Sequence, residues 1–500
     1  MLRFNYRLII YIIGLLLLFN SIAILSSSLV SFIYNDGFLF DIIKASIICF
    51  SIGIIVMLIS KNPSKVINRR DGYLIVVLGW LTMVFSGTLP YVFTDTINNI
   101  PDLVFETMSG YTTTGSSVIS DVESLPESIL FWRSMTHWLG GMGIIVLAIA
   151  ILPLLGIGGM QLFSAEAPGS GISGDKIHPR ISNTAKRLWL IYIGLTLMET
   201  ILLKIAGMSF FDAINHSMSN IATGGFSTKN DSLSFFNSMP LIQYIIVFFM
   251  LLAGTNFLLI YLSLLGKFKK LFYNTEFIWF VSLISFFVII TTFLLNSNVD
   301  LTNTDFNHPQ IYGKLEASFR HALFQVVAVI TTTGFVTSDF AGWSPFLTML
   351  FFGLMFLGAS SGSTSGGVKI SRHLILIKNG FLEFKRSLHP NAILPLRYNH
   401  SVVKKDVVVN ILAFFMLYLI LFIIGAAVLS TQGLDFISSI GGSAASLGNV
   451  GPALGSLGPS FNYEHITGFA KIWCSFLMLV GRLELFTLLI IFSPYFWKNL

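Results

Sequence analysis

The amino-acid sequence predicts an all-α membrane protein in which four similar units surround one pore, preceded by a two-helix hairpin. The chain of 500 residues is 54% hydrophobic and only 11% charged, whereas roughly 25% of a soluble domain is charged. About ten apolar runs reach the roughly 20 residues that a spanning helix requires. A short Thr-x-Gly or Ser-x-Gly stretch also recurs four times between such runs.

The first 71 residues are expected to form a transmembrane hairpin outside the four units. Its two spans are predicted over residues 8–34 and 38–60. The first apolar run is too long for a cleaved signal peptide, whose apolar region holds about 7–15 residues. We therefore expect this run to be retained as a spanning helix.

Each of the four following units is predicted to contain a span, a half-helix too short to cross, a short loop and a second span. The units are expected over residues 72–182, 183–270, 271–400 and 401–500. First spans are predicted over residues 72–93, 185–205, 277–295 and 407–429, and half-helices over 103–111, 210–221, 314–330 and 434–445. Second spans are predicted over residues 129–155, 241–265 and 466–492, with a third-unit span from residue 343.

The charged residues are distributed unevenly between the loops. Residues 61–70 carry four Lys or Arg and residues 369–405 carry eight, whereas residues 72–132 carry six acids and neither Lys nor Arg. Basic loops lie in the cytoplasm according to the positive-inside rule. The pattern predicts a multi-pass membrane protein with both termini cytoplasmic. It also argues against a nucleic-acid partner, despite the net charge of +6.

The recurring stretches are predicted to meet around one axis. Their marker glycines Gly115, Gly225, Gly334 and Gly448 lie 110, 109 and 114 residues apart. A single stretch of this kind would be interpreted as a turn or a helix C-cap. Four copies at nearly constant spacing, each between a half-helix and a long span, instead indicate an ion filter.

A filter of this kind replaces the water shell of a cation with rings of backbone carbonyls. Glycine reaches the backbone angles that aim successive carbonyls the same way. No acid lies within the stretches, which favours a monovalent ion over Ca²⁺, since Ca²⁺ prefers carboxylates. The residues predicted to bind this ion are Thr113, Thr114, Gly115, Thr223, Gly224, Gly225, Thr332, Thr333, Gly334, Ser446, Leu447, Gly448 and Asn449.

Polar residues near the filter give weaker signals. Seven residues before the start of each stretch stand Glu106, His216, Gln325 and Ser439, which suggests equivalent places on the half-helices. Arg133 and His137 are four residues apart on one predicted helix face. Without a carboxylate partner they make a poor metal or catalytic site, so packing near the membrane surface is the favoured interpretation.

Several segments together resemble TrkH-type subunits of the Trk/Ktr/HKT potassium transporter superfamily, and the resemblance covers essentially the whole chain. It implies potassium uptake through one pore per chain, a homodimer, and a cytosolic nucleotide-binding regulatory partner resembling TrkA. A channel and an ion-coupled uptake system both fit. The segments are residues 106–116, 132–142, 220–227, 331–335, 358–369, 446–451 and 481–486.

Two further features are candidate gating elements. Ten mostly small residues, from Gly358 to Gly367, interrupt the second span of the third unit. They could form a helix end with a turn, but the family implies a flexible loop below the filter, with Gly358, Gly362, Gly366 and Gly367 as hinges. Arg482 is a charge within the last apolar run and is expensive at that depth. We expect it to anchor this loop, although a packing role bonded to carbonyls or Glu484 is the alternative.

Other classes of protein are weaker candidates. Residues 441–445 faintly resemble an intramembrane serine protease turn with Ser443 as nucleophile, but no His or Asp can be assigned to it. An organic-solute transporter would have inverted repeats, whereas these units are predicted to be parallel. No nucleotide-binding motif appears. We therefore expect no enzyme activity and no organic cofactor, with K⁺ as the transported ion.

Overall fold

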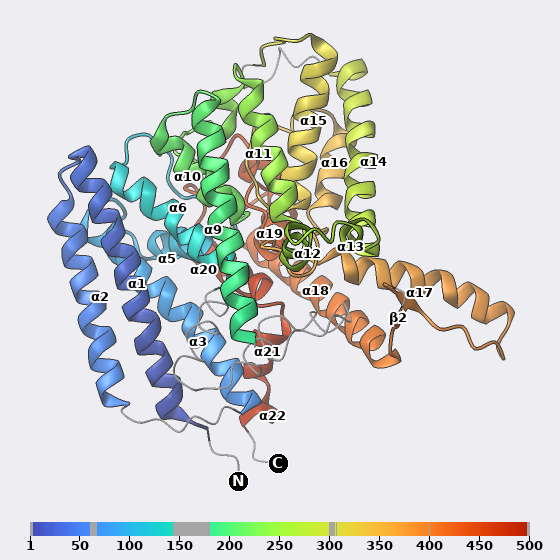
Figure 1. Ribbon diagram of the computed structural model, residues 1–500, viewed down its shortest axis with the longest axis horizontal. Coiled ribbons are helices and arrows are strands. Elements are labelled where there is room, and N and C mark those ends of the chain that lie inside the picture. Colours follow the sequence, from blue (N-terminus) through green and yellow to red (C-terminus); the bar gives the residue numbers. More distant parts are fainter. Residues whose placement is uncertain are drawn as a thin grey trace.

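The computed structural model describes residues 4–60, 68–143, 181–299, 306, 308–399 and 401–497. This part of the chain is almost entirely helical. Its one sheet is a short antiparallel hairpin of β1 (Arg397–Tyr398) and β2 (Ser401–Val402). The first and last described segments lie at the same end of the molecule (Figure 1), where the ring centroids of Phe4 and Phe496 are 5.7 Å apart, as expected for a chain with an even number of crossings.

The N-terminal hairpin consists of α1 (Tyr6–Tyr34) and α2 (Leu39–Ile59), and it stands at one side of the molecule (Figure 1). The two helices approach closely, because a Cβ added at Gly14 would lie 2.9 Å from the carbonyl oxygen of Gly53. Asn20 joins the hairpin to the first unit: its amide donates to Ser86 Oγ, and its Oδ1 accepts from the Tyr111 hydroxyl.

The four units follow in the predicted order. The first has α3 (Arg69–Gly87), α4 (Leu89–Phe93), α5 (Ile100–Tyr111) and α6 (Glu127–Gly141). The second has α9 (Ile181–Ile205), α10 (Phe210–Ile221), η2 (Ser232–Phe236), α11 (Pro240–Ala253), α12 (Phe257–Leu264) and α13 (Lys269–Phe272). The third has α14 (Thr275–Asn298), α15 (Lys314–Ile330), α16 (Pro345–Leu354) and α17 (Ile370–Leu388). The fourth has α18 (Lys405–Thr431), α19 (Phe436–Gly448), η4 (Gly455–Leu457), α20 (Gly468–Arg482), α21 (Phe486–Phe492) and α22 (Pro494–Trp497).

Of the half-helices α5, α10, α15 and α19, local sequence signals explain where α5, α10 and α19 begin. Ser209 and Asp435 cap α10 and α19 by accepting hydrogen bonds from the backbone N–H groups of Asp212 and Ser438, as N-cap residues do. Pro101 lies in the first turn of α5, where a missing N–H costs nothing. The bounds of α10 and α15 coincide with the sequence prediction.

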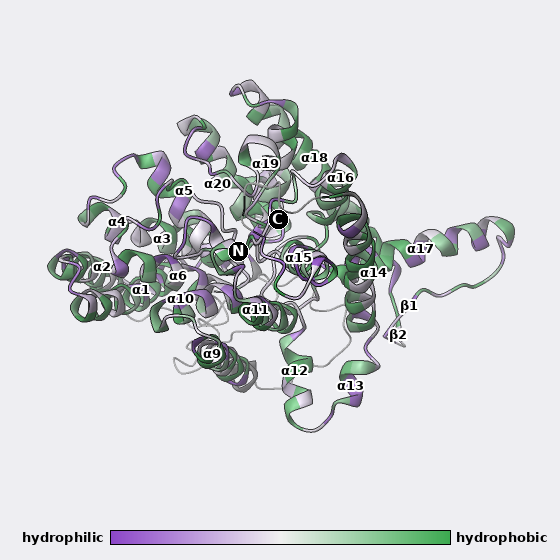
Figure 2. Ribbon diagram, turned by 90° about the horizontal axis from the view of Figure 1, so that it is seen from above, coloured by the Kyte–Doolittle hydropathy of each residue, from purple (hydrophilic) through white to green (hydrophobic). Residues whose placement is uncertain are grey.

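The outer helices carry the surface expected for contact with lipid. Six described helices are long and apolar enough to cross a membrane, or eight if each of two bent pairs forms one span. The peripheral helices α2, α14 and α18 are mostly hydrophobic (Figure 2). Large side chains such as Phe286, Ile289 and Phe293 project from α14 into the surroundings. They need no aqueous partner because lipid replaces water at this surface.

The second spans differ from the prediction of continuous helices. Helices α11 and α12 meet at a 102° bend, and α20 and α21 meet at a 115° bend. Glu484 and Leu485 have a φ of 54° at the second bend, a conformation that ends a right-handed helix. Predicted spans over residues 241–265 and 466–492 are therefore wrong as single helices. Hydropathy alone predicted them because it records apolar length and not direction. The predicted span 129–155 extends beyond the described residues.

Candidate functional site

The same backbone turn follows the first three half-helices. Each helix is followed by a threonine with positive φ: Thr113 at 53°, Thr223 at 56° and Thr332 at 56°. Two residues later comes a glycine with positive φ, which is Gly115 at 85°, Gly225 at 85° or Gly334 at 72°. Threonine rarely adopts this conformation, so its recurrence marks a position that the surrounding packing imposes.

The fourth unit has the same turn at a different place from the prediction. Helix α19 continues through Ser446, Leu447 and Gly448, and the positive φ values fall at Asn449 (53°) and Gly451 (97°). The fourth stretch is thus Asn449-Val450-Gly451, so the predicted register is wrong by three residues. Ser446, Leu447 and Gly448 form the last helical turn. Asparagine tolerates the left-handed region better than most residues, which allows Asn449 to take the place of threonine.

The four positive-φ glycines, called here the ring glycines, close a ring between the units. Each faces a carbonyl oxygen of the next unit so closely that a side chain would not fit. A Cβ added at Gly115 would lie 2.0 Å from the oxygen of Gly224, and one at Gly225 would lie 2.2 Å from that of Thr333. A Cβ added at Gly334 would lie 2.1 Å from the carbonyl oxygen of Val450. One added at Gly451 would lie 2.6 Å from that of Thr114, which closes the ring.

An open cavity of about 320 Å³ lies on one side of this ring, and all four ring glycines line it. Its wall is completed by the residues that follow them, including Ser116, Phe226, Val336 and Pro452. The cavity is on the side of the acidic loops, where the predicted external mouth should be. A path from this side therefore reaches the ring directly.

Several oxygens around the ring remain available. Thr113 Oγ1 and Asn449 Oδ1 are buried and have no hydrogen-bond partner among the described residues. By contrast, Thr114 Oγ1 accepts from the Asn449 amide at 2.9 Å, which ties the fourth unit to the first. The Asn449 side chain is directed toward α20, since its amide also donates to the carbonyl oxygen of Met478 at 2.9 Å and a Cβ added at Gly481 would lie 2.7 Å from its Oδ1. A buried oxygen without a partner is costly, which leaves Thr113 Oγ1 as a candidate ligand.

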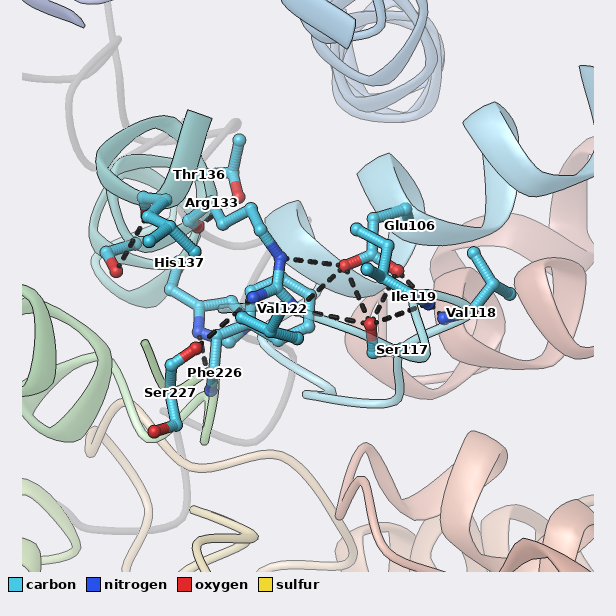
Figure 3. A network of polar contacts seen from close by, with 12 residues as sticks. Glu106, Ser117, Val118, Ile119, Val122, Arg133, Thr136, His137, Phe226 and Ser227 are labelled. Atoms are coloured by element: carbon cyan, nitrogen blue, oxygen red, sulfur yellow. Dashed lines mark hydrogen bonds and ion pairs between the residues drawn. The ribbon is translucent and has the colours of Figure 1, made fainter. Parts of the chain in front are cut away.

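A buried ion pair supports the first filter stretch (Figure 3). The Glu106 carboxylate accepts hydrogen bonds from Ser117 Oγ at 3.1 Å and from the backbone N–H of Val118 at 3.0 Å. Arg133 Nε donates to Glu106 at 3.0 Å, and Arg133 Nη1 donates to the carbonyl oxygen of Ser227 at 3.2 Å. This pair therefore links the half-helix, the stretch that leaves the filter, and the second unit.

The carboxylate partner of Arg133 was missed from the sequence, although Glu106 stands at the repeated half-helix position. The same position acts similarly in two other units: His216 Nε2 lies 2.9 Å from Ser227 Oγ, and Gln325 donates to Thr337 Oγ1 at 3.3 Å. In the fourth unit the corrected register places Gly442 there instead of Ser439. A Cβ at Gly442 would lie 2.8 Å from Leu457 Cδ1, so apolar packing replaces the polar link.

His137 explains why the second stretch has glycine at its middle position. Its ring stacks on Phe226 with centroids 4.0 Å apart, and its Nδ1 lies 2.9 Å from Ser219 Oγ. A Cβ added at Gly224 would come within 2.3 Å of His137 Nδ1. Arg133 and His137 are both buried inside the protein, and Arg133 has the carboxylate partner, Glu106, that the sequence prediction lacked.

The loop from Gly358 to Gly367, called here the inner loop, lies against the ends of the half-helices, on the side of the ring opposite the cavity. The backbone N–H of Gly366 donates to Thr332 Oγ1 at 2.7 Å, and Thr364 Oγ1 donates to the carbonyl oxygen of Ile221 at 3.0 Å. A Cβ at Gly366 would also lie 2.7 Å from Asn449 Cβ. The inner loop thus contacts three of the four units.

Glycines give the inner loop its turns. Gly362 and Gly367 have φ values of 75° and 63°, which favour glycine. Gly358 packs against Gly366, where an added Cβ would lie 2.7 Å from the carbonyl oxygen. The N–H of Gly358 also donates to Val368 O at 2.8 Å. These contacts bring the two ends of the inner loop together at its base.

Arg482 connects the inner loop to the opposite side of the pore. It is the last residue of α20, at the break in the helix. Its Nη1 donates to the carbonyl oxygen of Thr364 at 2.9 Å, and its Nη2 donates to those of Gly140 at 2.6 Å and Gly141 at 3.2 Å. The guanidinium therefore holds the inner loop and the end of α6 together.

Ser443, the nucleophile of the protease alternative, lies within α19. Its hydroxyl donates to the carbonyl oxygen of Phe422 at 2.8 Å. This is a bond between neighbouring helices, α19 and α18, and the hydroxyl has an ordinary structural role.

Four half-helices that end at a closed ring of glycine–carbonyl contacts define a membrane protein with re-entrant half-helices around one axis. The chain belongs to the TrkH family, since the model of this family, described as a cation transport protein, matches residues 39–498. It is 40% identical over 497 residues to the Trk system potassium uptake protein TrkH of Salmonella typhimurium, and 39% identical over 497 residues to that of Escherichia coli K12. Both alignments cover 99% of this chain and 100% of the relative.

The structure is also similar to the crystal structure of the potassium transporter TrkH from Vibrio parahaemolyticus. The TM-score is 0.87 at 36% sequence identity, and the match covers 99% of this chain and 100% of that chain. The four-unit fold class predicted from the sequence is thereby confirmed.

Breaking the buried pair should destabilise the protein strongly. Arg133 and Glu106 are 2% and 0% exposed, so Glu106→Gln leaves a buried guanidinium without its carboxylate. We expect a loss of about 3–5 kcal/mol in the free energy of unfolding, measured on the purified protein in detergent. The matched control is Glu383→Gln, which breaks the exposed Arg386–Glu383 pair and should cost no more than about 1 kcal/mol. Equal losses in the two variants would contradict this account.

Proposed function

We propose that this chain carries out potassium uptake and that the ring is its selectivity filter. The observation that carries the proposal is the ring itself, in which the carbonyl oxygens of Thr114, Gly224, Thr333 and Val450 each lie against a ring glycine of the preceding unit. A cation that leaves water needs such oxygens in place of its hydration shell. The names of the relatives from Salmonella typhimurium and Escherichia coli support potassium as the ion.

The proposed filter has one three-residue stretch from each unit. It lacks carboxylates, so an ion is bound by dipoles and can leave as readily as conduction requires. The unpartnered hydroxyl oxygen of Thr113 would add a ligand at the inner end. The stretches are Thr113-Thr114-Gly115, Thr223-Gly224-Gly225, Thr332-Thr333-Gly334 and Asn449-Val450-Gly451.

We assign gating to the inner loop and Arg482. The inner loop lies directly below the filter, where its bond to Thr332 would have to break before an ion could pass. Arg482 places a positive charge at the same level and holds the inner loop through Thr364. A fixed cation in a pore raises the barrier for other cations, so the closed arrangement opposes flux both sterically and electrostatically.

The proposed control by a cytosolic partner acts through α17, which follows the inner loop and projects from the rest of the molecule (Figure 1). Arg372 on α17 forms an ion pair with Glu484 at the α20–α21 bend, and its guanidinium lies 4.0 Å from the centre of the Phe414 ring. A partner that moved α17 would therefore pull on both gating elements. The phrase "Trk system" in the relatives' names supports a further component of the system, and we propose that this component is a TrkA-like partner with a nucleotide-binding site.

The proposal also includes a homodimer in the inner membrane with both termini in the cytoplasm. The basic segments, residues 61–70 and 369–405, support this orientation. K⁺ is the cargo, so the chain needs neither an organic cofactor nor an enzymatic site. The parallel order of the units and the hydrogen-bonded Ser443 do not support the solute-transporter or protease alternatives.

Gly115→Ser should impair selectivity, because its side chain has no room beside the oxygen of Gly224 and its φ of 85° is strained for serine. We expect the preference for K⁺ over Na⁺ to fall about tenfold or more, measured as ⁸⁶Rb⁺ uptake into proteoliposomes with Na⁺ as competitor. The control is Ser446→Ala, which removes a hydroxyl from the last turn of α19 and should leave selectivity unchanged. The proposal is wrong if wild-type protein carries no ⁸⁶Rb⁺, or if Gly115→Ser has wild-type selectivity.

Deleting residues 361–363 should raise uptake in the absence of any partner. The deletion shortens the inner loop, so that it can no longer reach both Thr332 and Arg482. We expect several-fold higher basal ⁸⁶Rb⁺ flux, because a loop that closes over a path gates passage along it. Unchanged or lower flux, in protein that elutes as a folded species in size-exclusion chromatography, would count against a gate in this segment.

A further inference from the structure

A buried polar chain on the outer side of the third unit leads from a charged residue to the filter. Arg320 on α15 forms an ion pair with Glu316 and donates from Nη1 to Gln243 Oε1 at 2.6 Å. The Gln243 amide donates to Asn237 Oδ1 at 2.5 Å. Asn237 Nδ2 donates in turn to the carbonyl oxygen of Thr337 at 3.0 Å and lies 3.3 Å from His308 Nδ1.

The Arg320 guanidinium fixes the donor and the acceptor of every hydrogen bond in this side-chain network. Arginine can only donate, so the oxygen of Gln243 faces Arg320 and its amide nitrogen faces Asn237. Asn237 must then accept through Oδ1 and donate through Nδ2. His308 Nδ1 is left as an acceptor, which leaves its proton on Nε2, facing Ser338 Oγ at 3.2 Å.

The last residue of this hydrogen-bond network, Thr337, positions the third filter stretch. Thr337 is three residues after the ring glycine Gly334. Its carbonyl is held by Asn237 from the second unit, while its hydroxyl accepts from Gln325 at 3.3 Å and lies 3.1 Å from His321 Nδ1. Movement of Thr337 would therefore be transmitted along three residues to the ring.

We propose that Arg320, Gln243, Asn237 and His308 are positioning residues for the third filter stretch, and that a proton bound by His308 from the outside disrupts them. The proposal rests on the proposed function, since it concerns the stability of that filter. A proton on Nδ1 would face the N–H of Asn237 donor to donor. The new positive charge would also lie among Arg320 and His321, whose ring centroid is 4.5 Å from that of His308.

The protonation behaviour of His308 fits this arrangement. The residue precedes α15 in an external loop and is 4% exposed. Burial, together with the charge of Arg320, lowers the pKa of His308 to about 4. Its neutral form therefore prevails at neutral pH, and the folded network loses stability as the pH falls below the ordinary pKa of histidine toward 4. Among the described residues, Glu316 is the acid that contacts this network: it pairs with Arg320 and accepts from the Tyr244 hydroxyl.

Two variants separate the network from other effects of acid. His308→Gln offers an acceptor to Asn237 and a donor to Ser338 but does not titrate. Asn237→Asp removes both donors that hold Thr337 and His308. The matched control is His465→Gln, the same substitution at an exposed histidine near the start of α20. All three are compared with the wild type by ⁸⁶Rb⁺ uptake into proteoliposomes, acidified only on the side of the acidic loops.

We expect wild-type and His465→Gln protein to lose about half or more of their uptake reversibly near pH 4, where half of His308 is protonated. His308→Gln should keep its uptake there. At neutral pH, Asn237→Asp should lower the preference for K⁺ over Na⁺ about tenfold. An acid profile of His308→Gln that coincides with the wild type overturns the proposal, even if Asn237→Asp does not fold. Uptake by the wild type at neutral pH tests the proposed function separately.

Discussion

The approach of each ring glycine to a carbonyl oxygen of the next unit is the contact on which the rest of the structure depends. At Gly115, Gly225 and Gly334 an added Cβ would lie 2.0–2.2 Å from that oxygen, a separation that no side chain tolerates. The contact needs an unusual backbone angle and an empty position at once, and only glycine supplies both. Because the fourth contact returns to Thr114, the units fix each other's place around the axis.

The elements around the ring hold each glycine–carbonyl contact in place. Each half-helix delivers its stretch to the centre, and the first three half-helices also bond to the chain that leaves it, through Glu106, His216 and Gln325. The fourth uses apolar packing around Gly442 instead. The ring thus has similar backbone geometry in all units and different chemical support, so the units need not respond alike to a proton or to a moving inner loop.

Much of this arrangement could be predicted from the sequence, because it depends on local signals. Apolar length, caps and the spacing of the first three glycines located the half-helices and three filter stretches. The fourth register was wrong because Ser446-Leu447-Gly448 matches the pattern, whereas only the backbone shows that Asn449 and Gly451 have positive φ. The partner of Arg133 and the bends at residues 254–256 and 483–485 depend on packing between distant segments, which hydropathy does not record.

The central claim is that ions bind at the ring formed by the carbonyls of Thr114, Gly224, Thr333 and Val450. Anomalous diffraction from crystals grown with Rb⁺ or Tl⁺ in place of K⁺ tests it most directly. The account predicts anomalous density on the axis between these four oxygens, beside the ring glycines, and none coordinated by Ser446 or Gly448. Density at those α19 residues, or none at the ring while ions bind elsewhere in the pore, would contradict it.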